Sequence, residues 1–217
     1  EEIGLVGAKN FNYDLVSASR AYELDTPGID WMVLHAPAAN RLHIEITGRE
    51  SHAGVAPEKG LSAILAAALA IEQMQLGRVD HETTANIGRI EGGVACNIVP
   101  RSVTLEGEAR SHDHDKLRAQ TEHMLDCFNQ AASSLSCEID GELVQPQVVF
   151  DVQPDYPRMA VSEDASVVTL ARSAAAAIGH DLKIRVGGGG SDANMFNANG
   201  IETVILGTGM QKVHSID

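Results

Sequence analysis

The chain has few basic residues. Of its 217 residues, 16 are Lys or Arg and 30 are Asp or Glu, which gives a formal net charge of −14 at pH 7. Nucleic acids and anionic lipids attract basic protein surfaces, so this charge argues against both as partners. A small-molecule or peptide substrate suits the composition better. The sequence also lacks any apolar run near the roughly 20 residues that a membrane-spanning helix needs, and we expect no membrane contact.

Cysteine is scarce as well. Cys96, Cys127 and Cys137 are an odd number of scattered residues, and no Cys-x-x-Cys pair indicates a zinc knuckle or a redox motif. The first residues lack the basic region of a signal peptide. We therefore expect a reducing, cytoplasmic setting. Apolar residues make up 44% of the chain, which is enough for a substantial core.

The middle of the chain has the pattern of a separate small domain. Its strands alternate apolar and polar residues, and its helices are alanine-rich or amphipathic. The expected elements are a strand at 41–48, a helix at 58–75 closed by Gly77, strands at 83–93 and 102–111, a helix at 113–135 and a strand at 137–150. This order predicts a ferredoxin-like α+β domain over residues 40–150.

The flanking segments alternate helices and strands in a different way. We expect a helix start at 1–11, strands at 21–25 and 30–36, a capped helix at 162–179, a strand at 181–186, a glycine loop and short helix at 187–196, and a strand at 201–209. Such alternation predicts a parallel α/β layer. We therefore interpret residues 1–39 and 151–217 as two segments of one larger α/β domain that contains the inserted domain.

Four side chains in the flanking segments are candidate ligands or bases. Glu1 and Glu2 can face one site only where the backbone turns, and the ordinary alternative is a pair that complements a helix dipole. Asp25 ends a strand before a turn, a position that suits both a ligand and an Asx turn. His214 follows the last strand by a short loop, where ligands and plain surface histidines both occur.

Two other motifs are less specific. Residues 112–115, His-Asp-His-Asp, directly precede a predicted helix, so we expect them to cap it rather than to bind metal. Residues 188–193 fit the G-x-G-x-x-A pattern of a dinucleotide site. The helix that follows is too short for a dinucleotide crossover, and no Walker lysine follows the glycines. We therefore do not expect a nucleotide there.

Seven motifs in order along the chain carry a family resemblance. They are "EEIGLVGA", "ELD", "GRESHAG", "ACNIVP", "EGEARSHDHDKL", "GGGGSDANMFNANGIETVILGTG" and a closing "HS". Together they resemble the peptidase T-like branch of the dinuclear zinc peptidases. That superfamily includes tripeptide aminopeptidases, glutamate carboxypeptidases, aminoacylases and acetylornithine deacetylases. The resemblance covers nearly the whole chain and implies an α/β catalytic domain with an inserted α+β lid and dimerisation domain.

The resemblance also implies roles for the matching residues. Glu1 would be the general base, Glu2 and His214 would ligate one metal, and Asp25 would ligate the other. His52 would hold the oxyanion of the tetrahedral intermediate. The residues expected to contact substrate are Asn97, Arg110, Gly189 and Ser191. Without the resemblance, His52, Asn97 and Arg110 would be interpreted as ordinary surface, turn and ion-pair residues.

Two functions remain open at this point. The first is hydrolysis of a peptide or acyl-amide bond in a homodimer joined through residues 40–150. This reaction would use two divalent ions, for which zinc is expected and manganese and cobalt are the alternatives. In the family, a His-x-Asp pair and a bridging carboxylate lie upstream, so we expect this chain alone to hold no stable dinuclear centre. The second is a truncated, non-catalytic oligomerisation module, built on the helix from Leu61 to Met74 and an open sheet edge.

Overall fold

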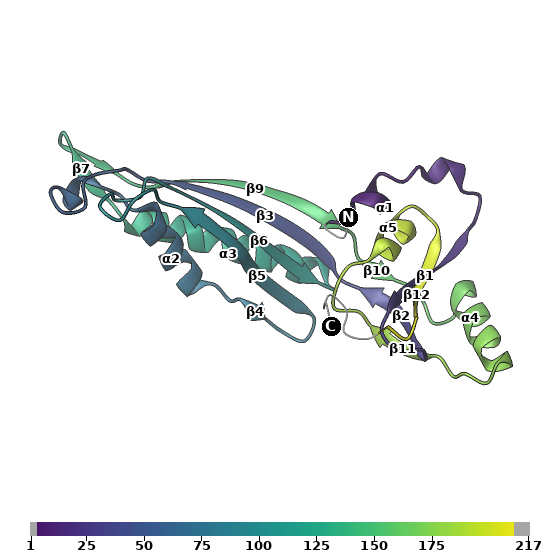
Figure 1. The fold of residues 1–217 in the computed structure, drawn as a ribbon. Coiled ribbons are helices and arrows are strands. Elements are labelled where there is room, and N and C mark those ends of the chain that lie inside the picture. Colours follow the sequence, from purple (N-terminus) through teal and green to yellow (C-terminus); the bar gives the residue numbers. More distant parts are fainter. Residues whose placement is uncertain (1–3, 211–217) are drawn as a thin grey trace. The chain divides into compact units, whose positions relative to one another are not determined.

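The computed structural model describes residues 4–210, which fold into two units (Figure 1). Unit 1 combines the segment up to Ala39 with the segment from Asp155 onward, and unit 2 is Asn40–Pro154. Each unit has its own sheet.

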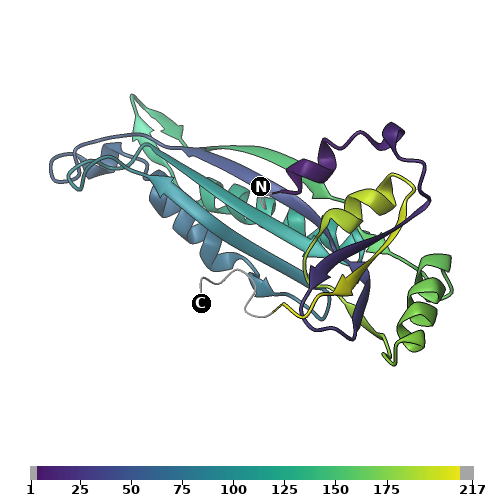
Figure 2. The same ribbon diagram turned by 45° about the vertical axis from the view of Figure 1, so that its right-hand side comes forward.

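Unit 1 is built around a mixed sheet. Its helices are α1 (Val6–Lys9), the 3₁₀ turn η1 (Tyr13–Leu15), α4 (Ser166–Ala177) and α5 (Asp192–Ala198). Its strands are β1 (Arg20–Thr26), β2 (Trp31–Ala36), β10 (Met159–Ala160), β11 (Lys183–Val186) and β12 (Glu202–Gly207). The strand order is β1-β12-β2-β10, and β11 also pairs with β2. Figure 2 shows α4 and α5 on opposite sides of the β1 and β12 pair.

The expected parallel layer is only partly right. β1 pairs with β12 in parallel and β11 pairs with β2 in parallel, but β2 is antiparallel to both β12 and β10. The reason is the short connection from β1 to β2. Gly28 has φ +79 there, so the chain reverses within a few residues, and so short a link cannot make the long crossover that parallel strands require.

The core of unit 1 is formed mainly by residues of β2, β12 and α4. Met32 and Leu34 on β2 are completely buried, as are Val167 and Val168 on α4 and Val204 on β12. β2 is buried along most of its length, as expected for a strand inside a covered sheet. This core fixes β12 and its neighbours, and therefore the strand ends near which Asp25 lies.

Unit 2 has helices on one face of an antiparallel sheet (Figures 1 and 2). Its helices are η2 (Pro57–Lys59), α2 (Ala63–Gln73) and α3 (His114–Ser134). Its strands are β3 (Ala38–Thr47), β4 (Gly77–Arg78), β5 (Thr83–Gly92), β6 (Ser102–Ser111), β7 (Cys137–Ile139), β8 (Glu142–Val144) and β9 (Gln147–Tyr156). The main sheet has the order β4-β5-β6-β3-β9, and β7 and β8 form a separate hairpin.

Helix α3 follows the sequence closely. Asp113 Oδ1 accepts hydrogen bonds from the backbone N–H of Asp115 at 2.8 Å and of Lys116 at 2.9 Å, which confirms the predicted capping role of residues 112–115. The buried residues of α3 include Leu117, Thr121, Met124, Phe128 and Ala132, which recur every three or four positions and so form one apolar stripe along the helix. α3 therefore packs on the sheet through the face that its periodicity indicates.

Two predicted boundaries in unit 2 are wrong. The single strand expected at 137–150 is instead the β7–β8 hairpin followed by β9, because Asp140 (φ 51) and Gly141 (φ 86) form a tight two-residue turn. Helix α2 ends at Gln73 rather than near Gly77, and Gly77, with φ +78, begins β4. The glycine turns the chain into the strand and does not end the helix.

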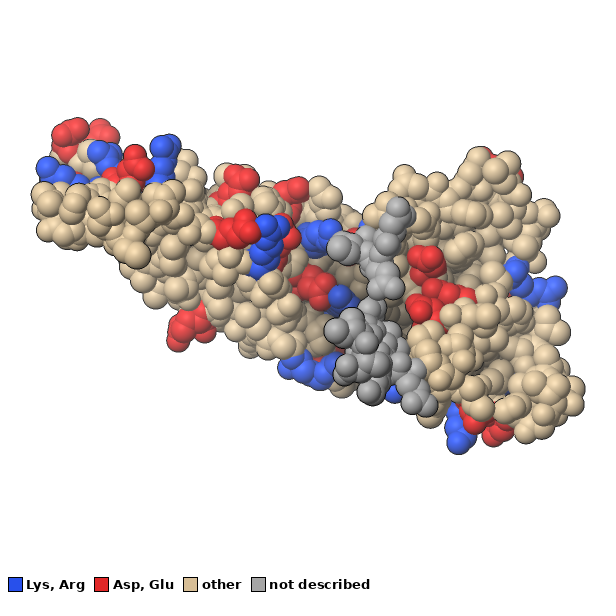
Figure 3. Space-filling view, viewed as in Figure 1, with Lys and Arg blue, Asp and Glu red and all other residues tan. Residues whose placement is uncertain are grey.

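The face of unit 2 drawn in Figure 3 has acidic and basic side chains interspersed, without a basic patch. The ion pairs on the sheet show the same mixture. Arg89 pairs with Glu91 and Glu106, and Arg110 pairs with Glu108. Among residues 4–210, no helix is both long and apolar enough to cross a membrane.

Candidate functional site

Three of the predicted catalytic and metal-binding residues, Glu1, Glu2 and His214, lie outside the described residues. The other predicted site residues are Asp25, His52, Asn97, Arg110, Gly189 and Ser191. Within residues 4–210, the structure gathers no group of three or more His, Cys, Asp or Glu side chains that could hold a metal ion.

Negative charge concentrates at the end of β1. Asp25 is exposed there, and Glu23 lies two residues before it. Burial raises the pKa of Glu23 above its ordinary value, and the nearby charges of Asp25 and Asp192 raise it further. Hydrogen bonds from Ser191 and Ala193 oppose this shift. The exposed carboxylate of Asp25 is an oxygen donor of the kind that divalent cations bind, so this side chain fits the metal that the resemblance implies.

The glycine loop at 187–190 is anchored at both ends. The Gly187 N–H donates to the His35 carbonyl at 2.7 Å, and the Gly190 N–H donates to the Tyr156 hydroxyl at 3.2 Å. A Cβ at Gly190 would lie 2.3 Å from the Tyr156 ring, so a larger residue cannot take this position without moving the ring. Gly188 is exposed and Gly189 is half-buried between these anchors.

Glu23 joins β1 to the start of α5. Glu23 Oε2 accepts hydrogen bonds from Ser191 Oγ at 2.8 Å and from the Ala193 N–H at 2.8 Å, and Oε1 accepts one from the Asp192 N–H at 3.2 Å. The Ser191 N–H donates to Asn194 Oδ1 at 3.0 Å. The buried Ser191 hydroxyl is thus used within the chain, and the carboxylate of Glu23 complements the helix dipole.

Glu23 was not among the residues singled out from the sequence. It lies within the "ELD" motif, but 168 positions separate it from Ser191, and no local pattern links a strand carboxylate to a helix start so far away. The sequence offered one signal, which is that a glutamate occupies a strand position. A carboxylate that is partly buried there needs hydrogen-bonding partners, but the sequence does not say which residues they are.

His52 and Asn97 are brought together in unit 2, although 45 positions separate them. The loops that carry them pair as a short irregular ladder: the Ala53 N–H donates to the Asn97 carbonyl at 2.9 Å and the Val99 N–H donates to the Ser51 carbonyl at 2.9 Å. An isolated bridge also joins His52 to Ile98. His52 and Asn97 are both exposed on this paired tip.

The His52 ring has a defined hydrogen-bonding arrangement. The Gly54 N–H donates to His52 Nδ1 at 3.1 Å, so Nδ1 must carry a lone pair. The proton of the neutral ring is therefore assigned to Nε2. An exposed Nε2–H is a hydrogen-bond donor, as a role in binding an oxyanion requires.

Arg110 lies on β6, on the sheet of unit 2. Its Nη2 donates to Glu108 Oε2 at 2.8 Å, and about 30% of its side chain is exposed. Residues 108 and 110 share a sheet face because side chains alternate along a strand. This ion pair is the ordinary role considered for Arg110 from the sequence.

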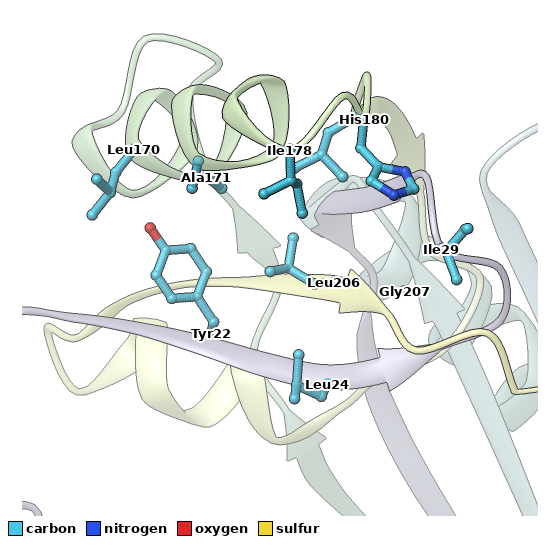
Figure 4. Close-up of a pocket in the computed structure, with 12 residues that line it drawn as sticks. Tyr22, Leu24, Ile29, Leu170, Ala171, Ile178, His180, Leu206 and Gly207 are labelled. Atoms are coloured by element: carbon cyan, nitrogen blue, oxygen red, sulfur yellow. The ribbon is translucent and has the colours of Figure 1, made fainter.

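An apolar cavity of about 680 Å³ in unit 1 contains none of the predicted site residues. Figure 4 shows Tyr22, Leu206 and Ile178 converging on it between the β1–β12 pair and α4. Tyr22 and Leu24 face this cavity, so Glu23, between them on β1, points to the other side of the sheet. The cavity is therefore separate from the strand face that carries Glu23 and the start of α5.

Residues 38–135 match the M20 peptidase dimerisation domain. The chain therefore carries the dimerisation domain of the M20 peptidase family, and this finding confirms the resemblance inferred from the motifs.

Similar solved structures cover almost the whole chain. Aminopeptidase PepT from Bacillus cereus is 41% identical with a TM-score of 0.84, over 99% of this chain and 56% of its own. A tripeptidase from Staphylococcus aureus is 39% identical with a TM-score of 0.88, over 99% of this chain and 55% of its own. The protein YqjE of Bacillus subtilis, which is uncharacterized, is 40% identical over 99% of this chain and 56% of its own length. The chain thus spans about half the length of these relatives.

Proposed function

We propose that the complete protein is a metal-dependent hydrolase that cleaves a peptide or acyl-amide bond in a small substrate, such as a di- or tripeptide or an N-acyl amino acid. The observation that carries the proposal is the 41% identity to aminopeptidase PepT over 99% of the chain. The M20 relatives are peptidases, which supports hydrolysis of peptides in general. In this proposal unit 1 belongs to the catalytic domain, unit 2 is the lid and dimerisation domain, and the setting is cytoplasmic.

The proposed mechanism assigns a task to each predicted residue. Asp25 holds one divalent ion, and Glu2 and His214 hold the other; zinc, manganese and cobalt all suit carboxylate and imidazole donors. When bound, such ions lower the pKa of water and polarise a carbonyl. Glu1 accepts the proton of the attacking water and passes it to the leaving amine.

The remaining residues bind and orient the substrate. His52 Nε2–H donates to the oxygen that becomes negative in the tetrahedral intermediate, which the hydrogen bond from Gly54 to Nδ1 supports. Asn97 shares the tip with His52, and Arg110 supplies a guanidinium for a carboxylate. Gly189 offers a backbone N–H on the anchored loop, and Ser191 begins the helix that holds this loop.

The test uses the complete protein and Glu1→Gln. Glu1→Gln should lower kcat for a tripeptide by about 10²-fold or more, as expected for loss of a general base. Bound metal, measured by elemental mass spectrometry, should remain at two ions per chain because Glu1 is not a proposed ligand. Glu72→Gln, at a charged residue of α2, is the control. If Glu1→Gln kept near-normal turnover, Glu1 would be excluded as the general base. If the complete protein bound no metal, the metal-dependent mechanism would be excluded.

A second function, assembly, is supported by the match of residues 38–135 to a dimerisation domain. We propose a homodimer formed through unit 2, in which the exposed Ile64 and Leu65 of α2 are available apolar groups. Sedimentation of the complete protein at micromolar concentration should give a dimer. A monomer at that concentration would rule out this assembly, whether or not the protein is a hydrolase.

A further inference from the structure

The start of α5 is held by a charge from a distant strand. Glu23 takes three donors at once: Ser191 Oγ, the Asp192 N–H and the Ala193 N–H. Both of its carboxylate oxygens are used in this way. Hydrogen bonds to a carboxylate are stronger than those between neutral groups, so this junction ties β1 firmly to the helix start.

The same junction closes one end of the glycine loop. Gly187 is fixed to β2 through the His35 carbonyl, and Gly190 is fixed to Tyr156. Ser191 follows Gly190 directly and is fixed to Glu23. The loop therefore spans two rigid strands, β2 and β1, with Gly188 and Gly189 between its fixed ends.

We propose that Glu23 is a positioning residue that sets the glycine loop, and the N–H groups of Gly188 and Gly189, relative to the strand end that carries Asp25. This inference rests on the proposed function, in which the loop binds substrate. β1 carries both Asp25 and the anchor of the loop, so one strand fixes the distance between them. A site that must hold reacting groups within a fraction of an ångström benefits from such a rigid support.

The proposal also specifies which loop groups bind substrate. Glu23 and Asn194 already accept hydrogen bonds from the N–H groups of residues 191–193. The start of α5 therefore has no donors left among these three for a substrate oxygen. Recognition on this loop is assigned to Gly188 and Gly189, whose N–H groups make no hydrogen bond within the described part of the chain.

Unit 1 offers a matched control for Glu23. Glu202 on β12 is also half-buried, and its Oε2 accepts hydrogen bonds from Ser166 Oγ at 3.2 Å and from the Val167 N–H at 3.3 Å at the start of α4. The chemistry is the same, a glutamate that binds a serine hydroxyl and a backbone N–H at a helix start. Glu202, however, binds the start of α4, which lies on the cavity side of the sheet, and does not bind the glycine loop.

The first measurement is hydrogen exchange of the loop in the complete protein. Glu23→Gln should speed amide exchange in residues 187–193 by about tenfold or more, because the amide nitrogen of Gln repels donors that Glu accepts. Glu202→Gln should leave exchange in this segment unchanged and speed it at the start of α4. Unchanged exchange at 187–193 in Glu23→Gln would overturn the proposal, and this readout does not depend on any activity.

The second measurement is steady-state kinetics with a tripeptide. Glu23→Gln should raise KM by about fivefold or more with little change in bound metal, whereas Glu202→Gln should leave KM within about twofold of the wild type. Equal effects of the two variants on KM would overturn the positioning role, and loss of metal in Glu23→Gln would make Glu23 a ligand instead.

If Glu23→Gln does not fold, Ser191→Ala removes one of the three contacts and should show the same exchange and KM changes in smaller measure. A wild type without hydrolase activity would refute the proposed function but leave the exchange result valid.

Discussion

The backbone N–H of Ala53 donates a hydrogen bond to the backbone carbonyl of Asn97 at 2.9 Å. This bond joins two loops that are separate in the sequence, and the Val99 to Ser51 hydrogen bond continues the pairing. His52 and Asn97 therefore lie on two loops that are hydrogen-bonded to each other and form one structural unit. Any change in the backbone of one loop moves the candidate residue of the other.

The first prediction concerns His52. In the complete protein, His52→Gln should lower kcat by about 10²- to 10³-fold, the usual effect of removing one donor to a developing oxyanion. KM should change little, because the donor acts mainly in the transition state. The exposed ring contributes little packing, so the thermal midpoint should stay close to that of the wild type.

A suitable control for this prediction is His43→Gln. His43 is a partly exposed histidine on β3 that lies beside Glu45, so its loss removes a similar ring from the same unit. A kcat in His52→Gln equal to that of His43→Gln would show that His52 takes no part in the reaction.

The second prediction concerns the close contact at Gly48. A Cβ at this position would lie 2.0 Å from the backbone carbonyl oxygen of Leu61, which already accepts a hydrogen bond from the Arg49 N–H. Gly48→Ala should lower the free energy of unfolding by about 1–3 kcal/mol, because backbone atoms must shift to admit the methyl group. Urea unfolding followed by circular dichroism measures this change.

Gly88→Ala is the matched control for Gly48→Ala. A Cβ there would come within 3.5 Å of Asn86 Nδ2, an ordinary contact, so the free energy of unfolding should change by less than about 1 kcal/mol. If Gly48→Ala were as stable as Gly88→Ala, the close approach of residues 48 and 61 would be disproved.

The third prediction concerns pH. Hydrogen bonds from the Glu82 N–H and from Lys116 hold the pKa of Asp80 well below its usual 3.8. A lowered carboxyl pKa contributes stability that is present above pH 3.8 and is lost as pH falls through the lower, folded-state value. Asp80→Asn should therefore be less stable than the wild type at pH 7, and the difference should shrink as pH falls below 4.

Thermal melts at pH 7 and pH 3 measure the effect of Asp80→Asn. Asp126→Asn, at an exposed position of α3, is the control and should behave like the wild type at both pH values. A difference between Asp80→Asn and the wild type that stays constant or grows toward pH 3 would contradict the assigned ion pair.

Local signals in the sequence predicted the local structure well. The Asp113 cap and the buried stripe of α3 depend on residues within a few positions of one another, so periodicity and capping chemistry were sufficient. The Asp140–Gly141 turn was missed because strand-forming residues on both sides resemble one continuous strand. The Asp-Gly pair was the available signal.

Long-range pairing was not predictable in the same way. β12 lies between β1 and β2, although it follows β2 by more than 160 residues, and no local pattern specifies that insertion. The same limit explains Glu23, whose partners belong to a helix near the other end of the chain. For the candidate site, the motifs predict which residues take part, but the hydrogen-bonding partners of these residues depend on contacts that only the folded chain creates.

The β7–β8 hairpin has a practical use. Its turn is formed by Asp140 and Gly141. Among residues 4–210, a Cβ at Gly141 would meet no atom within 4 Å, and β7 and β8 pair only with each other. Exposed turns of this kind tolerate inserted residues. A short affinity tag or a fluorophore attachment sequence placed between residues 140 and 141 would therefore label or purify the protein without changing the main sheet of either unit.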